Sequence, residues 1–273
     1  MRRSRQGKSA EILRSPARIT RNGRGELLID LGADVKLILI GIKAGSFVMG
    51  SPEGELGRGY NETQHRVTLT KDYWLGKYPV TQRQYETVVG RNPSAFCHIW
   101  PNTPDYPVEN VSWNLARRFC NRLNELIKLL PDYRFDLPTE AQWEYACRAG
   151  TTTALNSGSD LTTDWGKCPA LAGVGWYEDN CLTDRPVGRK KPNAWGLYDM
   201  HGSVFEWCRD WYECEYASDP EFLGGQKKCE FRVARGGGHR SEPEDCRSAK
   251  RECFDPKERY KDIGFRLALV PVR

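Results

Sequence analysis

The fold is decided by AWGLYDMHGSVFEWCRDWY (residues 194–212), FRVARGGGHRSEPEDCRSAKRE (231–252) and DIGFRLALV (262–270). Glycines and short polar residues predict a loop in the first stretch, before an aromatic run that begins at Phe205. In the second stretch an alternating strand ends on three glycines, which lack a Cβ and let the backbone pass very close to another segment. The third stretch alternates as a half-buried terminal strand. A long polar insert lies between these two strands, and we expect function there.

The N-terminal half carries the more regular elements. Residues 26–49 read as two or three short strands, and residues 65–70 as another. Capping-box patterns that begin at Thr81 and Thr139 predict helices over 82–90 and 140–149. Ser112 caps the clearest helix, whose buried face is predicted from the spacing of Trp113, Ala116, Cys120, Leu123 and Ile127. Early helices followed by short strands and long loops indicate an α+β fold, and loops of this length serve a site or are held by ions.

Residues 1–25 are predicted to be a flexible basic arm, and residues 26–273 a single domain, because no Pro/Ser/Gly-rich linker divides the chain. Such an arm is usually solvated, and binding to nucleic acid or to an anionic surface is the less favoured alternative. The arm has no apolar segment of the kind found in a secretory signal. The longest apolar run, Leu37–Ile42, is too short to span a bilayer.

The chain has 10 cysteines but no C-x-x-C pair. Cys120 and Cys147 fall on predicted helix faces, as small apolar residues do. With no export signal, reduced thiols and a cytoplasmic location are predicted. A longer natural N-terminus would leave a surface or secreted location open.

The three C-terminal stretches contain GLYDMHGSVFEW, RVARGG and GFRLA, and further blocks precede them: AGSFVMGS (44–51), KYPVTQRQY (77–85), PVENVSW (107–113) and LPTEAQWEYACRAG (137–150). In this order they resemble the signature blocks of the formylglycine-generating enzyme (sulfatase-modifying factor) family. The resemblance implies a variant of the C-type lectin fold, with short antiparallel strands, few helices and much irregular loop. Many members of the family do not make formylglycine, so the blocks specify the fold more closely than the activity.

A calcium site is one candidate. Asp199 and Glu206 could supply carboxylate oxygens, and Gly202 and Val204 could supply backbone carbonyls, to an ion that accepts six to eight such ligands. On spacing alone, Asp199 is as well explained as a turn residue. The resemblance implies a structural calcium at these positions, with Asn in the family where this chain has Asp199. The family's second calcium site would fall around residues 176–180.

A copper site is the second candidate. The resemblance implies that the oxidases of the family bind copper(I) through two cysteines five residues apart, after the strand that ends in glycines. Counting from those glycines puts Ser241 at the first position and Cys246 at the second, and a hydroxyl cannot replace a thiolate for Cu(I). Counting back from Arg251 leaves neither position as cysteine. Phe205, Gly238 and Asp262 also replace the family's Trp, Ser and Asn, so neither copper nor oxidase activity is expected.

Two other chemistries have less support. His239, Ser241 and Asp245 are residue types that perform acyl transfer, but neighbours in sequence rarely reach triad geometry. The chain's 4 histidines include no H-x-x-x-H pair, so nothing indicates an iron centre.

The insert 238–262 is interpreted as a surface that displays varied side chains on a rigid scaffold. Its layout resembles the variable proteins of diversity-generating retroelements, some of which use this enzyme-like lectin fold. A non-catalytic protein that binds a protein or peptide ligand is therefore predicted. The alternatives are an oxidoreductase acting on a peptide cysteine, or an inactive paralogue of one. The predicted ligand-binding residues are His239, Arg240, Ser241, Asp245, Lys250, Glu252, Phe254, Tyr260 and Asp262. Phe254 and Tyr260 are expected to supply anchoring area without contributing much to stability.

Overall fold

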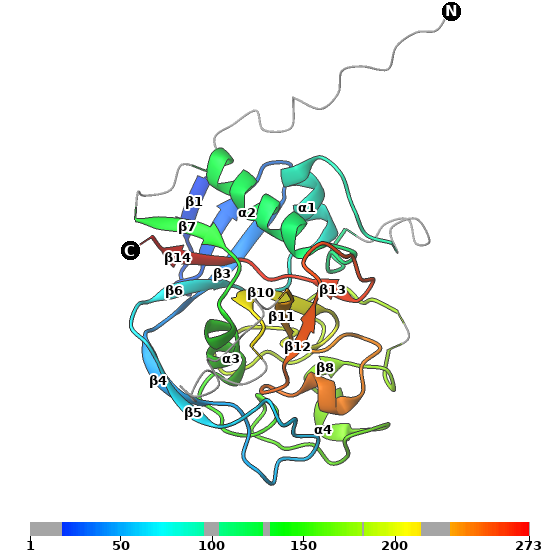
Figure 1. Ribbon diagram of the computed structural model, residues 1–273. Coiled ribbons are helices and arrows are strands. Elements are labelled where there is room, and N and C mark those ends of the chain that lie inside the picture. The colour runs from blue at the N-terminus through cyan, green and yellow to red at the C-terminus, as the bar shows by residue number, and fades with distance from the viewer. Residues whose placement is uncertain (1–17, 96–103, 128–131, 182, 214–229, 273) are drawn as a thin grey trace, which may run out of the picture.

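The computed structural model describes residues 18–95, 104–127, 132–181, 183–213 and 230–272. Within these ranges the strands form one large sheet, one smaller sheet and two short ribbons, with helices beside them (Figure 1). Most strand pairs are antiparallel, whereas β10 (Phe205–Trp211) pairs with β13 (Ile263–Gly264), and β8 (Gly175–Trp176) with β9 (His201–Gly202), in parallel. The predicted α+β fold with short strands and much irregular loop is confirmed.

The large sheet joins the two ends of the described chain, because the C-terminal strand lies between strands from the first half. Its order is β1 (Arg18–Arg21), β2 (Leu27–Asp30), β3 (Lys36–Ile42), β6 (Tyr73–Gly76), β14 (Ala268–Pro271) and β7 (Tyr133–Asp136). One face of β2 and β3 is apolar and buried, and both strands fall within residues 26–49, where short strands were predicted.

The smaller sheet carries the segments on which the sequence analysis centred. Its order is β12 (Glu252–Phe254), β11 (Arg232–Arg235), β10 (Phe205–Trp211) and β13 (Ile263–Gly264). The two ribbons are β4 (Gly45–Met49) with β5 (His65–Leu69), and β8 (Gly175–Trp176) with β9 (His201–Gly202). The polar insert therefore leaves the sheet after β11, returns as its edge strand β12, and leads into β13.

Three helices of the described chain begin where the capping signals predict. α1 (Gln82–Val89) and α3 (Glu140–Arg148) have complete capping boxes at Thr81 and Thr139, and Ser112 caps α2 (Trp113–Leu126) through its side chain. A fourth, short helix, α4, spans Pro169–Ala172. α2 buries Ala116, Phe119, Cys120 and Leu123. Phe119 packs between Tyr85 and Phe265, with ring centroids 5.5 and 5.2 Å away, so an aromatic cluster joins both early helices to the C-terminal segment.

Several arginines are completely buried, which costs much desolvation unless each meets a carboxylate. Arg266 donates to both oxygens of Glu206, at 2.8 and 3.0 Å, and Arg235 pairs with Glu144. The alternation in 262–270 predicted a half-buried strand across Arg266. The predicted strand is too long, because β14 begins only at Ala268. Arg266 is completely buried, and Glu206 compensates its charge.

The predicted arm also needs a correction. Residues 18–21 form β1, which pairs antiparallel with β2, so the domain begins before residue 26. The rest of the predicted arm, residues 1–17, lies outside the described residues. Among the helices that the structure describes, none has the length and apolar character needed to cross a membrane.

Candidate functional site

The polar insert begins at a sharp bend of the backbone. Gly236 and Gly237 have φ of 99° and 77°, a region that favours glycine. A Cβ on Gly237 would lie 2.7 Å from the Cys246 sulfur. The close approach expected at the glycines is therefore real, and the neighbour is the insert's own 3-10 helix, η3 (Pro243–Cys246).

The first part of the insert is buried rather than displayed. His239 is 1% exposed and Ser241 is 8% exposed, so neither side chain lies at the outer surface as the display interpretation assumed. His239 Nδ1 lies 3.0 Å from Asp184 Oδ1 and 3.3 Å from the Ser203 carbonyl oxygen. The Ser241 hydroxyl accepts a hydrogen bond from Gly238 N at 3.0 Å. These side chains hold the bend in place, and the Ser241 hydroxyl is occupied by that turn.

Arg247, directly after η3, fastens the middle of the insert to the loop after β4. Its guanidinium, which is fully buried, donates to Glu55 at 2.7 Å and to both oxygens of Glu62 at 2.8 Å. It also donates to the carbonyl oxygens of Gly57 and Glu244. A guanidinium presents five donors in a fixed plane, so one side chain can connect these separate segments rigidly.

Arg251 fastens the return strand. It donates to both oxygens of Glu140 at the start of α3, at 2.6 and 3.0 Å. Arg235, on β11, donates hydrogen bonds to the carbonyl oxygens of Ala249 and Lys250. The backbone of 247–251 is thus held by buried ion pairs and hydrogen bonds, independently of the side chains that face solvent.

Several other polar side chains of the insert reach the surface. Arg240 is exposed, and Asp262 is partly exposed. Lys250 pairs with Asp245 at 2.8 Å and with Glu252 at 3.3 Å, and all three side chains are partly exposed. The structure therefore brings three of the predicted ligand-binding residues, Asp245, Lys250 and Glu252, together at the surface.

Phe254 and Tyr260 are partly buried, so we expect them to contribute to stability, unlike the prediction from the sequence that they contribute little. Their rings lie 4.9 Å apart. Phe254 also makes edge contacts with Phe205 and Trp207, at 5.7 and 6.0 Å, and both Phe254 and Tyr260 pack against the main apolar core. Their rings therefore connect the insert to the core.

The positions that correspond to the family's oxidase centre do meet in space. A Cβ on Gly238 would lie 3.3 Å from Asp262 Cβ and 3.5 Å from the Phe205 ring. Cys246, in contrast, points inward into an apolar cluster that also contains Cys168. Burial raises the pKa of the Cys246 thiol well above its usual value, which favours the protonated thiol in the metal-free protein.

The residues predicted to bind calcium are all buried. Asp199 is buried, and its Oδ2 accepts from Gly188 N at 2.6 Å, while its Oδ1 is buried with no hydrogen-bond partner among the described residues. Burial raises the pKa of Asp199 to about 6. Glu206 is committed to Arg266 and also accepts from Trp143 Nε1 at 2.7 Å. Within the described ranges, no three His, Cys, Asp or Glu side chains form a group that could hold a metal. The calcium prediction requires only two carboxylates.

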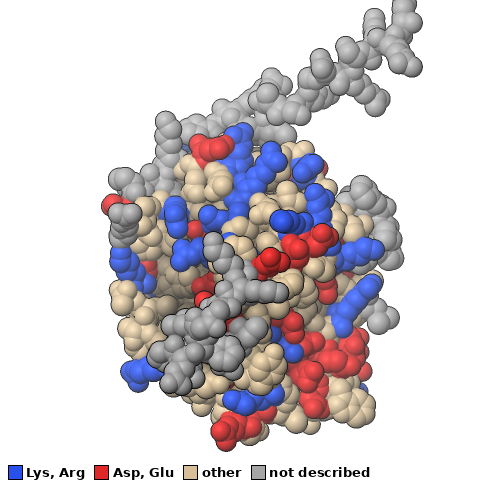
Figure 2. Space-filling model, viewed as in Figure 1, with Lys and Arg blue, Asp and Glu red and all other residues tan. Residues whose placement is uncertain are grey.

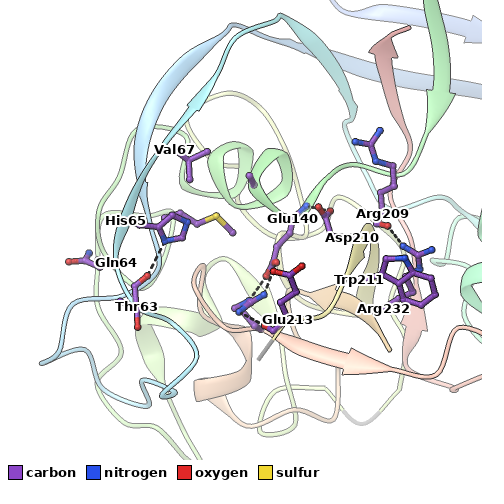
Figure 3. A pocket seen from close by; sticks show the side chains of 13 residues that line it. Thr63, Gln64, His65, Val67, Glu140, Arg209, Asp210, Trp211, Glu213 and Arg232 are labelled. Atoms are coloured by element: carbon purple, nitrogen blue, oxygen red, sulfur yellow. Dashed lines mark hydrogen bonds and ion pairs between the residues drawn. The ribbon is translucent and has the colours of Figure 1, made fainter. Parts of the chain in front are cut away.

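A cavity of about 680 Å³ opens at the far ends of β10 and β11 (Figure 3). In its lining, Arg251 pairs with Glu140, and the Asp210 carboxylate accepts a hydrogen bond from Glu140 N at 2.7 Å. Arg232 lies over the Trp211 ring, 3.4 Å from its centroid. Sequence patterns could not indicate this cavity, because its walls come from segments far apart in the chain.

Residues 37–270 match the family model of the sulfatase-modifying factor enzyme 1-like domain, and the chain belongs to this family. It is 31% identical over 241 residues to the chaperone protein LppX of Paenibacillus barcinonensis, a match covering 74% of this chain and 81% of that protein. It is 32% identical to the formylglycine-generating enzyme of Streptomyces coelicolor, with 60% of this chain and 53% of the enzyme covered. The chain thus spans about half of that enzyme's length.

Among solved structures, the fold is similar to that of Treponema denticola variable protein 1, with a TM-score of 0.76 and 30% identity over 89% of this chain and 98% of that one. It is also similar to PvdO from Pseudomonas aeruginosa, with a TM-score of 0.71 and 26% identity over 94% and 99% of the two chains. Proteins similar to this chain are thus named as a chaperone, an enzyme and a variable protein. The fold alone therefore does not specify an activity, which depends on the residues of the site.

Proposed function

We propose that the chain is a non-catalytic binding protein whose ligand contacts the outer side chains of residues 238–262. The observation that carries this proposal is the division within the insert. Its backbone is held by the buried arginines 235, 247 and 251, whereas Arg240, Lys250 and Glu252 face outward. A rigid frame with varied outward side chains binds at a low cost in conformational entropy.

The partner of such a surface is a protein or peptide. The similarity to a structure named as a variable protein supports a surface whose outer residues differ between copies of the gene. The exchangeable positions would be Arg240, Asp245, Lys250, Glu252 and Asp262, because their side chains reach solvent. His239 and Ser241 are reassigned to holding the bend.

An oxidoreductase that acts on a peptide cysteine is the second candidate, supported by the similarity to formylglycine-generating enzymes. It would need a thiolate pair, and that pair is incomplete whether the insert is aligned from its glycines or from Arg251. Titration with Cu(I) separates the two functions. Binding of one equivalent that Cys246→Ala abolishes would favour the oxidase, and we expect no such binding.

We further propose that Asp199 and Glu206 hold a structural calcium ion with the Gly202 and Val204 carbonyls. The buried, unpartnered Oδ1 of Asp199 fits a calcium ligand, since an orphaned oxygen is otherwise costly. Arg266 opposes the proposal, because it already supplies Glu206 with a positive charge. When bound, calcium would stiffen the loop before β10 and perform no chemistry.

Site-specific photo-crosslinking tests the binding proposal. A benzophenone side chain replaces Lys261, which is exposed at the edge of the surface, or Lys71, which is exposed in the turn between β5 and β6. In extracts of the source organism we expect one dominant adduct from position 261 and none from position 71. The adduct is then purified as a separate protein and its Kd is measured. Equal labelling from both positions, or no measurable affinity, would refute the proposal.

A further inference from the structure

One part of the molecular surface has a charge opposite to that of the whole chain, whose net charge is +5. Figure 2 shows Asp and Glu side chains gathered at the lower right, where Figure 1 places α4, β8 and the orange segment that contains η3. We call this surface the acidic rim and define it by Glu178, Asp179, Glu242, Glu244 and the exposed apolar residues Leu56 and Trp165.

Backbone hydrogen bonds hold two carboxylates of the rim side by side. Glu178 N donates to the Ser241 carbonyl oxygen at 3.2 Å, which fixes the loop after β8 against the start of the insert. Glu242 follows Ser241 directly, and its Oε2 accepts from Gly166 N at 2.9 Å. Burial and the neighbouring Glu242 carboxylate together raise the pKa of Glu178. The loops after α3 and β8 therefore present their side chains next to the proposed binding surface.

Among the described residues, the glutamates of the rim differ from the nearby Asp245 in their ion pairing. Asp245, close by, is paired with Lys250 at 2.8 Å. No ion pair involving Glu178, Glu242 or Glu244 is found among the residues that the structure describes. Carboxylates held close together without counter-charges attract a cationic partner and raise its rate of association.

Apolar side chains flank these carboxylates. Glu244 N donates to the Asp164 carbonyl oxygen at 3.1 Å, and the next residue, Trp165, is 73% exposed. On the other side, a Cβ on Gly57 would lie 2.6 Å from Glu244 Cβ, and the preceding Leu56 is 42% exposed. An exposed Trp of this kind is a common anchor in protein interfaces, and its ring face also attracts guanidinium and ammonium groups.

We propose that the acidic rim docks a cationic segment of the protein partner, a peptide stretch that combines lysines or arginines with at least one apolar side chain. The inference rests on the proposed binding function and names the chemistry of the ligand. Glu178, Glu242 and Glu244 pair with the cations, and Trp165 with Leu56 receives the apolar group. Nucleic acid does not fit this surface, because its phosphates would be repelled.

Titration with two fluorescein-labelled synthetic peptides of 12 residues, on the order of a single docked segment, tests the inference. One contains Lys, Arg and Leu, and the other contains Glu and Leu in the same order. The protein variants are the double variant Glu178→Lys with Glu242→Lys, and Trp165→Ala. The matched control is Glu86→Lys, which reverses an exposed acid on α1, away from the rim. Thermal unfolding confirms that each variant is folded.

We expect the cationic peptide to bind the unchanged protein and the Glu86→Lys control alike. The double reversal should weaken its binding by about tenfold or more, and Trp165→Ala by about fivefold. Raising the salt concentration should weaken binding as well, because exposed charges are screened. Equal binding to the double reversal and the control, or equal binding of the acidic peptide, would overturn the inference.

The crosslinking experiment distinguishes a failure of the inference about the acidic rim from a failure of the proposed binding function. If the partner crosslinked from position 261 binds the double reversal with unchanged affinity, the surface binds a protein but the rim does not select a cationic segment. If position 261 yields no adduct while the cationic peptide binds as expected, the rim is a docking site and the proposed function of the insert is wrong. Binding of Ca²⁺ alone to the rim, with no peptide binding, would also overturn the inference.

Discussion

Replacing Arg247 by Met should destabilise the protein strongly without touching any side chain that faces a ligand. The methionine keeps much of the apolar volume but removes the guanidinium that neutralises Glu55 and Glu62, both of which are buried. Removing one partner of a buried ion pair costs about 3–5 kcal/mol, because the other charge stays buried without compensation. Summing the charged hydrogen bonds at about 2 kcal/mol each would give more. Either carboxylate can take up a proton instead, so we expect a loss of about 4 kcal/mol in the free energy of unfolding.

Urea titration at pH 7 measures this loss, with Lys257→Ala as the control. Lys257 is exposed in the same insert, and its loss should change the free energy of unfolding by no more than about 0.5 kcal/mol. Adding Glu62→Gln to Arg247→Met should restore part of the stability, since it removes one of the uncompensated charges. A loss below about 1 kcal/mol for Arg247→Met would refute the claim that buried ion pairs hold the insert.

The pH dependence of the same variant gives a second test. Burial opposes ionisation of Glu62, but the hydrogen bonds and charge of Arg247 outweigh it and lower the pKa of Glu62. A carboxyl whose folded pKa is lowered adds stability above its unfolded value of about 4.3, and this stability is lost as the pH falls through the folded value. Without Arg247, the buried carboxyl prefers its proton. The difference between the two proteins should therefore shrink as the pH is lowered from 7 towards 4, and a constant difference would contradict this explanation.

The remaining predictions concern the backbone bend at Gly237, the partly buried Phe254 and the loop before β10. Gly237→Ala should lower the free energy of unfolding by about 2–4 kcal/mol, because the new Cβ would clash with Cys246 and the positive φ is strained. Gly90 also has a positive φ but open space around it, so Gly90→Ala should lower the same quantity by only about 1 kcal/mol in urea titration. Phe254→Ala should lower the free energy of unfolding by about 2 kcal/mol, less than a fully buried Phe, and an unchanged value would restore the view that Phe254 only anchors a ligand. Saturating Ca²⁺ should stabilise the protein against heating by about 2–3 kcal/mol relative to EDTA, an effect absent in Asp199→Ala; identical melting in Ca²⁺ and EDTA would contradict the calcium site.

Local signals predicted the helices well, because a capping box such as that at Thr81 is a contact between residues three apart. The burial of His239 and Ser241 could not be predicted in the same way, since an irregular loop has no periodicity that separates an inner from an outer face. Arg247 was missed for a different reason. Its main partner Glu62 is 185 residues away, and no spacing rule connects them. β1 was assigned to the arm because its composition is basic, and its four exposed residues show no buried face that a pattern could reveal.

The central claim is that the frame of residues 238–262 is independent of the side chains it presents. One variant tests it most directly, with Arg240, Lys250, Glu252 and Lys261 all replaced by Ala, measured both for its free energy of unfolding and for its Kd with the partner crosslinked from position 261. We expect the stability to stay within about 1 kcal/mol of the unchanged protein, while the affinity falls by about 100-fold. Unchanged affinity, or a loss of stability comparable to that of Arg247→Met, would contradict the account.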